Sequence, residues 1–247
     1  MILDLLIGGS TGFLSGFLGV GGGFILVPLL IFINVPTHFA IGSSLAYIVF
    51  TGVSGTIQHY RQRDCDPKIA LPMILGGVIT AQLGSIAMSL FSSSDLEIML
   101  SIALVVASII MVTTRNRRGM DGNSTINYSR NIPLAILIGL TVGFLSGFLG
   151  VGGGFILVPL MVLLLKMPIR IAIGTSLLEV ACYAASGAIG HLMMGNVDLP
   201  LVGILAVGGI VASPLGAIAT KKASPQHLRE IFAAVLILFA IKLLIPS

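Results

Sequence analysis

Two glycine-rich segments of this 247-residue chain have the composition that lets a backbone approach an anion. Residues 19–24 read GVGGGF, and residues 150–155 repeat the same letters. Helices that begin within them, at Gly22 and Gly153, would present unpaired N–H groups and a partial positive charge to an anion. The alternative is that the glycines only allow helices to cross closely. The residues predicted to bind an anion are Gly21, Gly22, Gly23, Phe24, Gly152, Gly153, Gly154 and Phe155.

A nucleotide-binding loop does not fit these glycines. Phe24 occupies the position of the third glycine in the dinucleotide fingerprint, and no Lys-Ser or Lys-Thr pair follows as in a phosphate-binding loop. The flanking residues are apolar on both sides. We therefore do not interpret these glycines as a dinucleotide or phosphate loop.

Matched hydroxyl groups follow a glycine near the start of two later apolar segments. They are Ser43 and Ser44 in the first half of the chain, and Thr175 and Ser176 in the second. Such hydroxyls can donate to an oxyanion, which places them beside the predicted anion site. The alternative is that they bond to carbonyl groups of their own helix, as Ser and Thr often do in membranes.

A few polar side chains lie within apolar segments, where they are candidates for gating or proton coupling. Glu179 stands near the middle of segment 171–194, and an ionisable group at membrane depth is costly enough to indicate function. Its alternative role is a neutral carboxyl packed against a neighbouring helix. His59 and His191 close matched segments and either carry protons or act as interfacial polar groups. Gln82 is a weaker candidate of the same kind.

These candidates are positioned by an internal duplication of the chain. The string GFLSGFLGVGGGFILVPL occurs at residues 12–29 and again at 143–160. Further matches continue downstream and pair His59 with His191, whereas Tyr47 is matched by Glu179. The chain is therefore two copies of one unit, which we assign to residues 1–113 and 131–247, with residues 114–130 as a cytoplasmic linker.

The composition is that of a membrane protein. Hydrophobic residues make up 56% of the chain and charged residues 9%, well below the roughly 25% of a soluble domain. We expect no removable signal peptide, no metal site and no disulfide between the two cysteines, and the net charge of +4 reflects orientation in the membrane rather than nucleic-acid binding. Eight hydrophobic segments are visible, at 5–33, 40–60, 69–91, 96–113, 132–165, 171–194, 199–219 and 230–246.

The first segment of each half is longer than one span requires and is interrupted by its glycine cluster, which predicts two half-helices. If this pair is re-entrant, twelve of the thirteen Lys and Arg residues fall on one side of the membrane. If it crosses once, the division is eight against five. The positive-inside rule therefore favours inverted repeats, each with a re-entrant pair and three full spans, and with both termini outside.

The paired glycine blocks at 19–28 and 150–159, the blocks at 42–44 and 174–176, and the segments that close on histidine resemble the TauE/SafE sulfite exporter family. The resemblance implies a multi-pass transporter in a prokaryotic cytoplasmic membrane that moves sulfite, sulfoacetate or another small anion without a cofactor. From the inverted architecture we expect a secondary transporter with its site between the repeats. The nearest alternative is an anion channel. An intramembrane enzyme finds no support, because the sequence offers no Ser-His pair at helical spacing and no reactive-cysteine setting.

Overall fold

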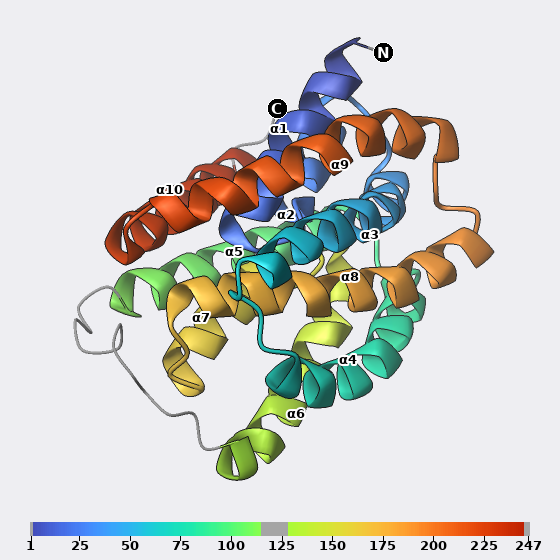
Figure 1. Cartoon of the computed structure of the whole chain (residues 1–247). Coiled ribbons are helices and arrows are strands. Elements are labelled where there is room, and N and C mark those ends of the chain that lie inside the picture. The colour runs from blue at the N-terminus through green and yellow to red at the C-terminus, as the bar shows by residue number, and fades with distance from the viewer. Residues whose placement is uncertain (1, 115–127, 245–247) are drawn as a thin grey trace.

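A computed structural model describes the backbone of residues 2–114 and 128–244, which is helical apart from short connections (Figure 1). The first half forms α1 (Ile2–Leu18), α2 (Gly23–Phe32), α3 (Thr37–Arg61), α4 (Pro67–Met88) and α5 (Ser93–Thr114). The second half forms α6 (Tyr128–Leu149), α7 (Gly154–Leu164), α8 (Ile169–Met193), α9 (Leu199–Lys222) and α10 (Pro225–Leu244). The expected linker lies mostly outside the described residues.

The predicted break in the first segment of each half is present. Gly19, Gly21 and Gly22 have φ angles of 76°, 76° and 87°, which side chains rarely adopt, and α1 ends just before them. The same pattern separates α6 from α7. Gly22 packs against Thr11 and Ser15 of α1, so the chain turns back along the helix it has just left. The following helices begin at Gly23 and Gly154, one residue later than predicted.

Matched local signals set the boundaries of the longer helices in both halves. The Asp66 carboxylate accepts a hydrogen bond from the Lys68 N–H at the start of α4, and Asp198 accepts one from the Leu201 N–H at the start of α9. Each aspartate is the N-cap of its helix, and a proline follows in the first turn, where its missing N–H costs nothing. The duplication has therefore kept the capping signals together with the helices.

The two halves interlock. A glycine ladder, in which glycines recur every four residues, lies on the first helix of each half. The ladder of α1 packs against α9 of the other half, and the ladder of α6 packs against α4. Its members are Gly8, Gly12 and Gly16 on α1 and Gly139, Gly143 and Gly147 on α6. Gly12, for example, lies so close to Gly209 that a methyl group on it would be 2.6 Å from the Gly209 Cα. These glycines therefore allow the paired helices to cross closely, and the halves share one hydrophobic core.

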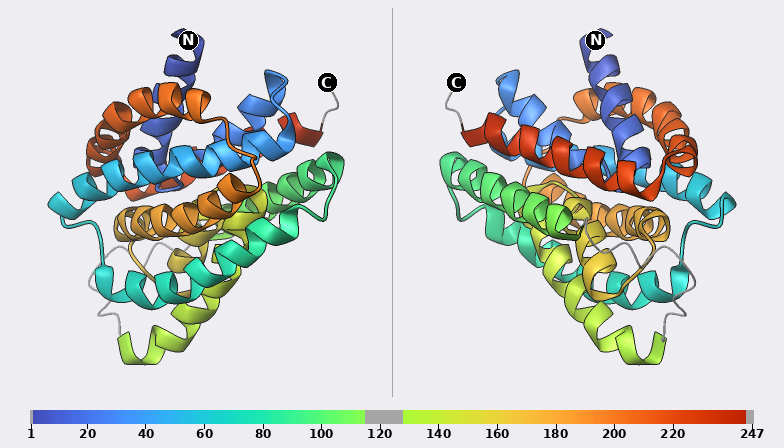
Figure 2. Two further views of the ribbon diagram at one scale, coloured as in Figure 1. Left: turned by 90° about the vertical axis from the view of Figure 1, so that its right-hand side faces the viewer. Right: turned by 90° about the vertical axis from the view of Figure 1, so that its left-hand side faces the viewer.

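Helices α3 and α8 run antiparallel through the middle of the molecule. Gly42, near the start of α3, packs against His191 at the end of α8, and Gly174, near the start of α8, packs against His59 at the end of α3. Figure 2 shows this pair as a central layer, with α1 and α9 on one side of it and α4 and α6 on the other.

Among the described residues, six helices are long and apolar enough to cross a membrane. Within the same residues, the eight predicted hydrophobic segments appear as ten helices, because the first segment of each half is divided. The candidate spans are Thr37–Arg61, Pro67–Met88, Ser93–Ile110, Ile132–Leu149, Ile169–Met193 and Leu199–Lys222.

Candidate functional site

The two glycine breaks meet at the centre of the molecule. A methyl group on Gly23 would lie 3.0 Å from the carbonyl oxygen of Gly150, and one on Gly154 would lie 2.7 Å from that of Gly19. Residues 19–24 and 150–155 are all buried, so this conformation is closed to solvent at the breaks. The duplication therefore brings together two segments that are more than a hundred residues apart in sequence.

Two apolar side chains frame this meeting point. Ile48 of α3 and Val180 of α8 occupy matched positions, and each lies against both Gly21 and Gly152. Both side chains are fully buried. The surroundings are thus of low dielectric, where backbone dipoles act strongly on a charge.

Each break leads into a helix whose N-terminus carries no side-chain cap. The N-cap residues are Gly22 and Gly153, with φ angles of 87° and 75°. In α2 the N–H groups of Ile25 and Leu26 return to the Gly22 carbonyl, and α7 repeats this arrangement. The first N–H groups of an α-helix have no carbonyl acceptor within the helix. Such N–H groups bind anions at helix N-termini.

The hydroxyl groups predicted at the site divide into two kinds. Ser43 Oγ accepts a hydrogen bond from the Asp198 N–H (3.0 Å), and Thr175 Oγ1 accepts one from the Asp66 N–H (2.9 Å). These two hydroxyls tie the helix start in one half to a loop in the other half. They do not contact the breaks through those bonds.

Ser44 and Ser176 lie next to the breaks, but only one of them is satisfied. Ser176 Oγ donates to the Gly19 carbonyl at 2.6 Å. Its counterpart Ser44 is fully buried beside Gly23, and its Oγ has no hydrogen-bond partner among the described residues. An unpaired buried hydroxyl costs free energy, so Ser44 is a donor left available for a ligand.

Sequence reasoning missed two further hydroxyls at the breaks. Ser15 and Ser146 are fully buried, and each Oγ lacks a partner within the described part of the chain. Ser15 lies beside Gly22, and Ser146 lies beside Gly153. Both belong to the duplicated string, so a matched polar residue within an otherwise apolar repeat was the available signal.

Glu179 is fully buried, and neither carboxylate oxygen has a hydrogen-bond partner in the described structure. Tyr183, one turn further along α8, interacts with it electrostatically without the geometry of a hydrogen bond. The matched residue Tyr47 is satisfied, since its hydroxyl donates to the Gly8 carbonyl (2.6 Å) and lies 2.9 Å from Thr11 Oγ1. The second half therefore carries a buried acid where the first half has a bonded phenol.

The two histidines are fully buried within the protein. His59 Nε2 lies 2.8 Å from the Gly16 carbonyl, and His191 Nε2 lies 3.2 Å from the Gly147 carbonyl. Each histidine therefore holds the last turn of the first helix in its own half. Gln82 is half-buried on α4 beside Gly190 of α8 and does not reach the breaks.

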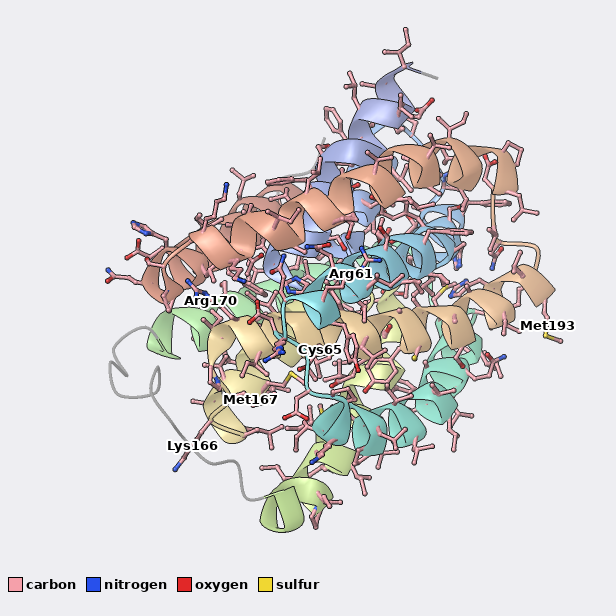
Figure 3. All side chains as sticks on the ribbon, viewed as in Figure 1. Arg61, Cys65, Lys166, Met167, Arg170 and Met193 are labelled. Carbon is pink, nitrogen blue, oxygen red and sulfur yellow. The ribbon has the colours of Figure 1, made fainter. Side chains whose placement is uncertain are left out.

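Basic loops gather at one end of the molecule. Arg170, at the start of α8, donates through Nη2 to the Ala223 carbonyl (2.7 Å) between α9 and α10. Figure 3 places Arg61, Lys166 and Arg170 toward this end and Met193 at the opposite one. Cys65 lies in the α3–α4 loop near them, and burial raises the pKa of its thiol to about 11, so it is a poor nucleophile.

The helix lengths, the apolar surface and the buried duplicated breaks define a multi-pass α-helical membrane protein. No group of three or more potential metal ligands occurs in the part of the chain that the structure describes. The model of the family "Sulfite exporter TauE/SafE" matches residues 4–243, and this chain belongs to that family.

Curated relatives extend over nearly the whole chain. A Bacillus subtilis protein named "Probable membrane transporter protein YunE" is 27% identical over 98% of this chain and 97% of its own length. The B. subtilis protein YdhB, named in the same way, is 33% identical over 87% of this chain and 89% of its own. A similarly named protein of Methanocaldococcus jannaschii is 26% identical over 95% and 91%. No solved structure matches the chain.

Proposed function

We propose that this protein is a secondary transporter that exports a small sulfur-containing anion, such as sulfite or sulfoacetate, across the cytoplasmic membrane of a prokaryote. The observation that carries the proposal is the contact between the two glycine breaks. Each break ends in an uncapped helix N-terminus, and two such termini with buried hydroxyls beside them supply donors for one anion.

The chemistry of these donors suits transport better than tight binding. Backbone N–H groups and the Ser44 hydroxyl carry only partial charges, and each helix terminus contributes about half an elementary charge. A Lys or Arg side chain at the same depth would hold an anion strongly and slow its release. Partial charges in a low-dielectric setting stabilise the anion while still permitting release when the site opens to water.

We propose further that the halves are inverted repeats with re-entrant first segments. Three features support this arrangement: α3 and α8 pack antiparallel, each break turns the chain back along its first helix, and the basic loops gather at one end. Antiparallel packing of two matched spans requires them to cross in opposite directions. Rocking of one half against the other would then expose the breaks to each side in turn.

Glu179 is the residue we assign to proton coupling. A carboxyl group that is fully buried without a hydrogen-bond partner in the described structure is neutral in the closed state, because a carboxylate there would be costly. Opening toward water would let it release its proton. Tyr47 at the matched position cannot do this, since its hydroxyl is bonded to the Gly8 carbonyl.

Transport by proteoliposomes tests the function. Purified protein should catalyse saturable uptake of labelled sulfite and counterflow against a gradient of unlabelled sulfite. Flux without saturation or counterflow would indicate a channel. Uptake of chloride or acetate in preference to every sulfur oxyanion would contradict the proposed substrate class.

The inverted topology is tested separately with single cysteines in a background that lacks Cys65 and Cys182. We expect Asn123→Cys, in the linker after the first half, and Ser224→Cys, in the second half, both to be protected from an impermeant thiol reagent in intact cells and labelled after permeabilisation. Met193→Cys lies at the end of α8 that is remote from Arg170 and the basic loops, and it should be labelled in intact cells. Labelling of only one of the cysteines at positions 123 and 224 in intact cells would contradict the inverted arrangement.

A further inference from the structure

An open groove of about 560 Å³ lies on the outer face of the molecule, between α3 and α9. Its walls are mostly apolar, and its volume lies in the range typical of small-molecule sites. The side chains that form its apolar part are Val49, Phe50, Val53, Ile57, Ile210 and Pro214.

Pro214 of α9 lines the groove. A proline within a helix has no N–H, so the carbonyl four residues earlier, here that of Ile210, lacks its usual donor within the helix. Ser54 of α3 donates to the freed Ile210 carbonyl at 2.7 Å and closes the floor of the groove. At the matched place in the other half, Ser186 donates to the Val78 carbonyl at 2.7 Å, but Gln82 replaces the proline.

One end of the groove is polar. Gln58 and Arg61 line it there, at the last turn of α3. Arg61 is exposed and lies at the end of the molecule where the basic loops gather. The residue that matches Arg61 in the other half is Met193, so the corresponding face of α8 has no cation at this position.

We propose that this groove binds an anionic phospholipid, with one acyl chain along the apolar wall and the phosphate group at Arg61. The groove faces outward from a helix that crosses the membrane, so lipid is the solvent that reaches it. Basic side chains at the ends of transmembrane helices attract anionic headgroups, and an arginine pairs with phosphate through two parallel N–H donors. Charge complementarity therefore selects an anionic lipid over a zwitterionic one.

The chain contains no tryptophan, so a single introduced Trp reports on its own surroundings. Ile57→Trp places the probe in the groove, and Ile189→Trp places it at the matched position on α8, where exposure is nearly the same (50% and 56%). The variants are reconstituted in phosphatidylcholine with a small fraction of brominated phosphatidylglycerol or brominated phosphatidylcholine. Bromine on the acyl chain quenches a Trp that it contacts.

At position 57 we expect brominated phosphatidylglycerol to quench with about fivefold higher apparent affinity than brominated phosphatidylcholine, since one basic residue favours an anionic lipid by about that factor. The Arg61→Gln change should remove this preference, whereas Arg63→Gln, which removes the same charge from the adjacent loop, should preserve it. At position 189 the two lipids should quench equally.

An equal preference for the anionic lipid at position 189 would overturn the proposal, as would equal effects of the two arginine changes or equal quenching by both lipids at positions 57 and 50. If Trp at position 57 displaces the lipid, Phe50→Trp provides an aromatic-for-aromatic probe in the same groove. Equal quenching by both lipids at position 50 as well would be decisive against the site.

Discussion

The two halves of the molecule agree in their packing and differ in their polar side chains. Both carry a glycine ladder on the first helix, a histidine bonded to the end of that helix and an aspartate that caps the fourth. The differences lie at matched positions. Tyr47 is matched by Glu179, and the unpaired Ser44 is matched by Ser176, which is bonded to the break of the opposite half. After the duplication, the two halves have therefore kept the same helix packing and have diverged in the side chains that can carry or bind a charge.

This asymmetry matters for transport. A perfectly two-fold site would offer an anion the same donors from each half and would have no proton-binding group on one side only. Glu179 gives the second half a buried carboxyl group where the first half has the phenol of Tyr47, and Ser44 gives the first half a hydroxyl with no hydrogen-bond partner among the described residues. We infer that both halves bind the anion and that only the second half, through Glu179, couples its transport to protons.

The largest effect is expected from side chains placed at the breaks. Gly22→Val and Gly153→Val each put a β-branched residue at a φ near +80°, with Thr11 or Val142 in the way, and should abolish sulfite binding. The strain alone is controlled by Gly195→Val, which has a φ of 72° but no neighbour within 4 Å. Binding of labelled sulfite to purified protein measures the effect. If both variants were expressed normally and bound sulfite with unchanged affinity, the glycines would serve only in packing.

The next effect separates the halves by chemistry. Glu179→Gln preserves the shape of the side chain and removes its proton, so uptake driven by a pH gradient should be lost while counterflow of sulfite remains. Tyr47→Phe at the matched position should keep the pH dependence and lose only a hydrogen bond. Transport is measured in proteoliposomes across a range of pH on both sides of neutrality. A Glu179→Gln variant with normal rate and normal pH dependence would reduce the residue to packing.

The serine pair should respond in opposite ways. Ser44→Ala removes an unpaired buried hydroxyl, so thermal stability should stay the same or rise, while sulfite affinity falls by about tenfold because a bond to a charged ligand is lost. Ser176→Ala removes a bond to Gly19 and should lower the free energy of unfolding by about 1 kcal/mol. Melting in detergent and sulfite binding distinguish them. Identical behaviour of the two variants would show that the asymmetry has no functional meaning.

The smallest effect on transport is expected for changes in the packing that the two halves share. Gly12→Ala and Gly143→Ala force a methyl group against the backbone of Gly209 or Gly77, and each should cost about 1–3 kcal/mol of stability without changing specificity. Gly9→Ala on the same helix as Gly12 has no neighbour within 4 Å and should be neutral or stabilising. Thermal unfolding in detergent measures all three variants. A Gly12→Ala variant as stable as the parent would argue against the tight crossing of α1 and α9.

Features encoded locally could be predicted from the sequence. The helix break follows from four glycines in five residues, and the packing role of the glycine ladder follows from its spacing of four. The identity of the partner helix could not be predicted, because contact between α1 and α9 depends on how the halves assemble. The hydrogen-bond partners of His59 and His191 could not be predicted for the same reason: Gly16 and Gly147 are more than forty residues away in sequence.

The candidate site is predictable in its backbone and less so in its side chains. The predicted helix starts lie within one residue of the observed ones. The sequence predicts Ser43 and Thr175 beside the anion, but their hydroxyls accept N–H groups from loops of the opposite half, a pairing that no local pattern encodes. Ser15 and Ser146 reach the breaks only because the chain turns back on its first helix.

The most direct test of the account is the position of a bound oxyanion. Selenite has the charge and shape of sulfite, and its selenium is located by anomalous diffraction from crystals of the complex. The account predicts a peak between the breaks, within hydrogen-bond distance of N–H groups in residues 21–23 and 152–154 and near the Ser44 hydroxyl. A peak beside Arg61 or Arg170, with the breaks empty, would contradict it.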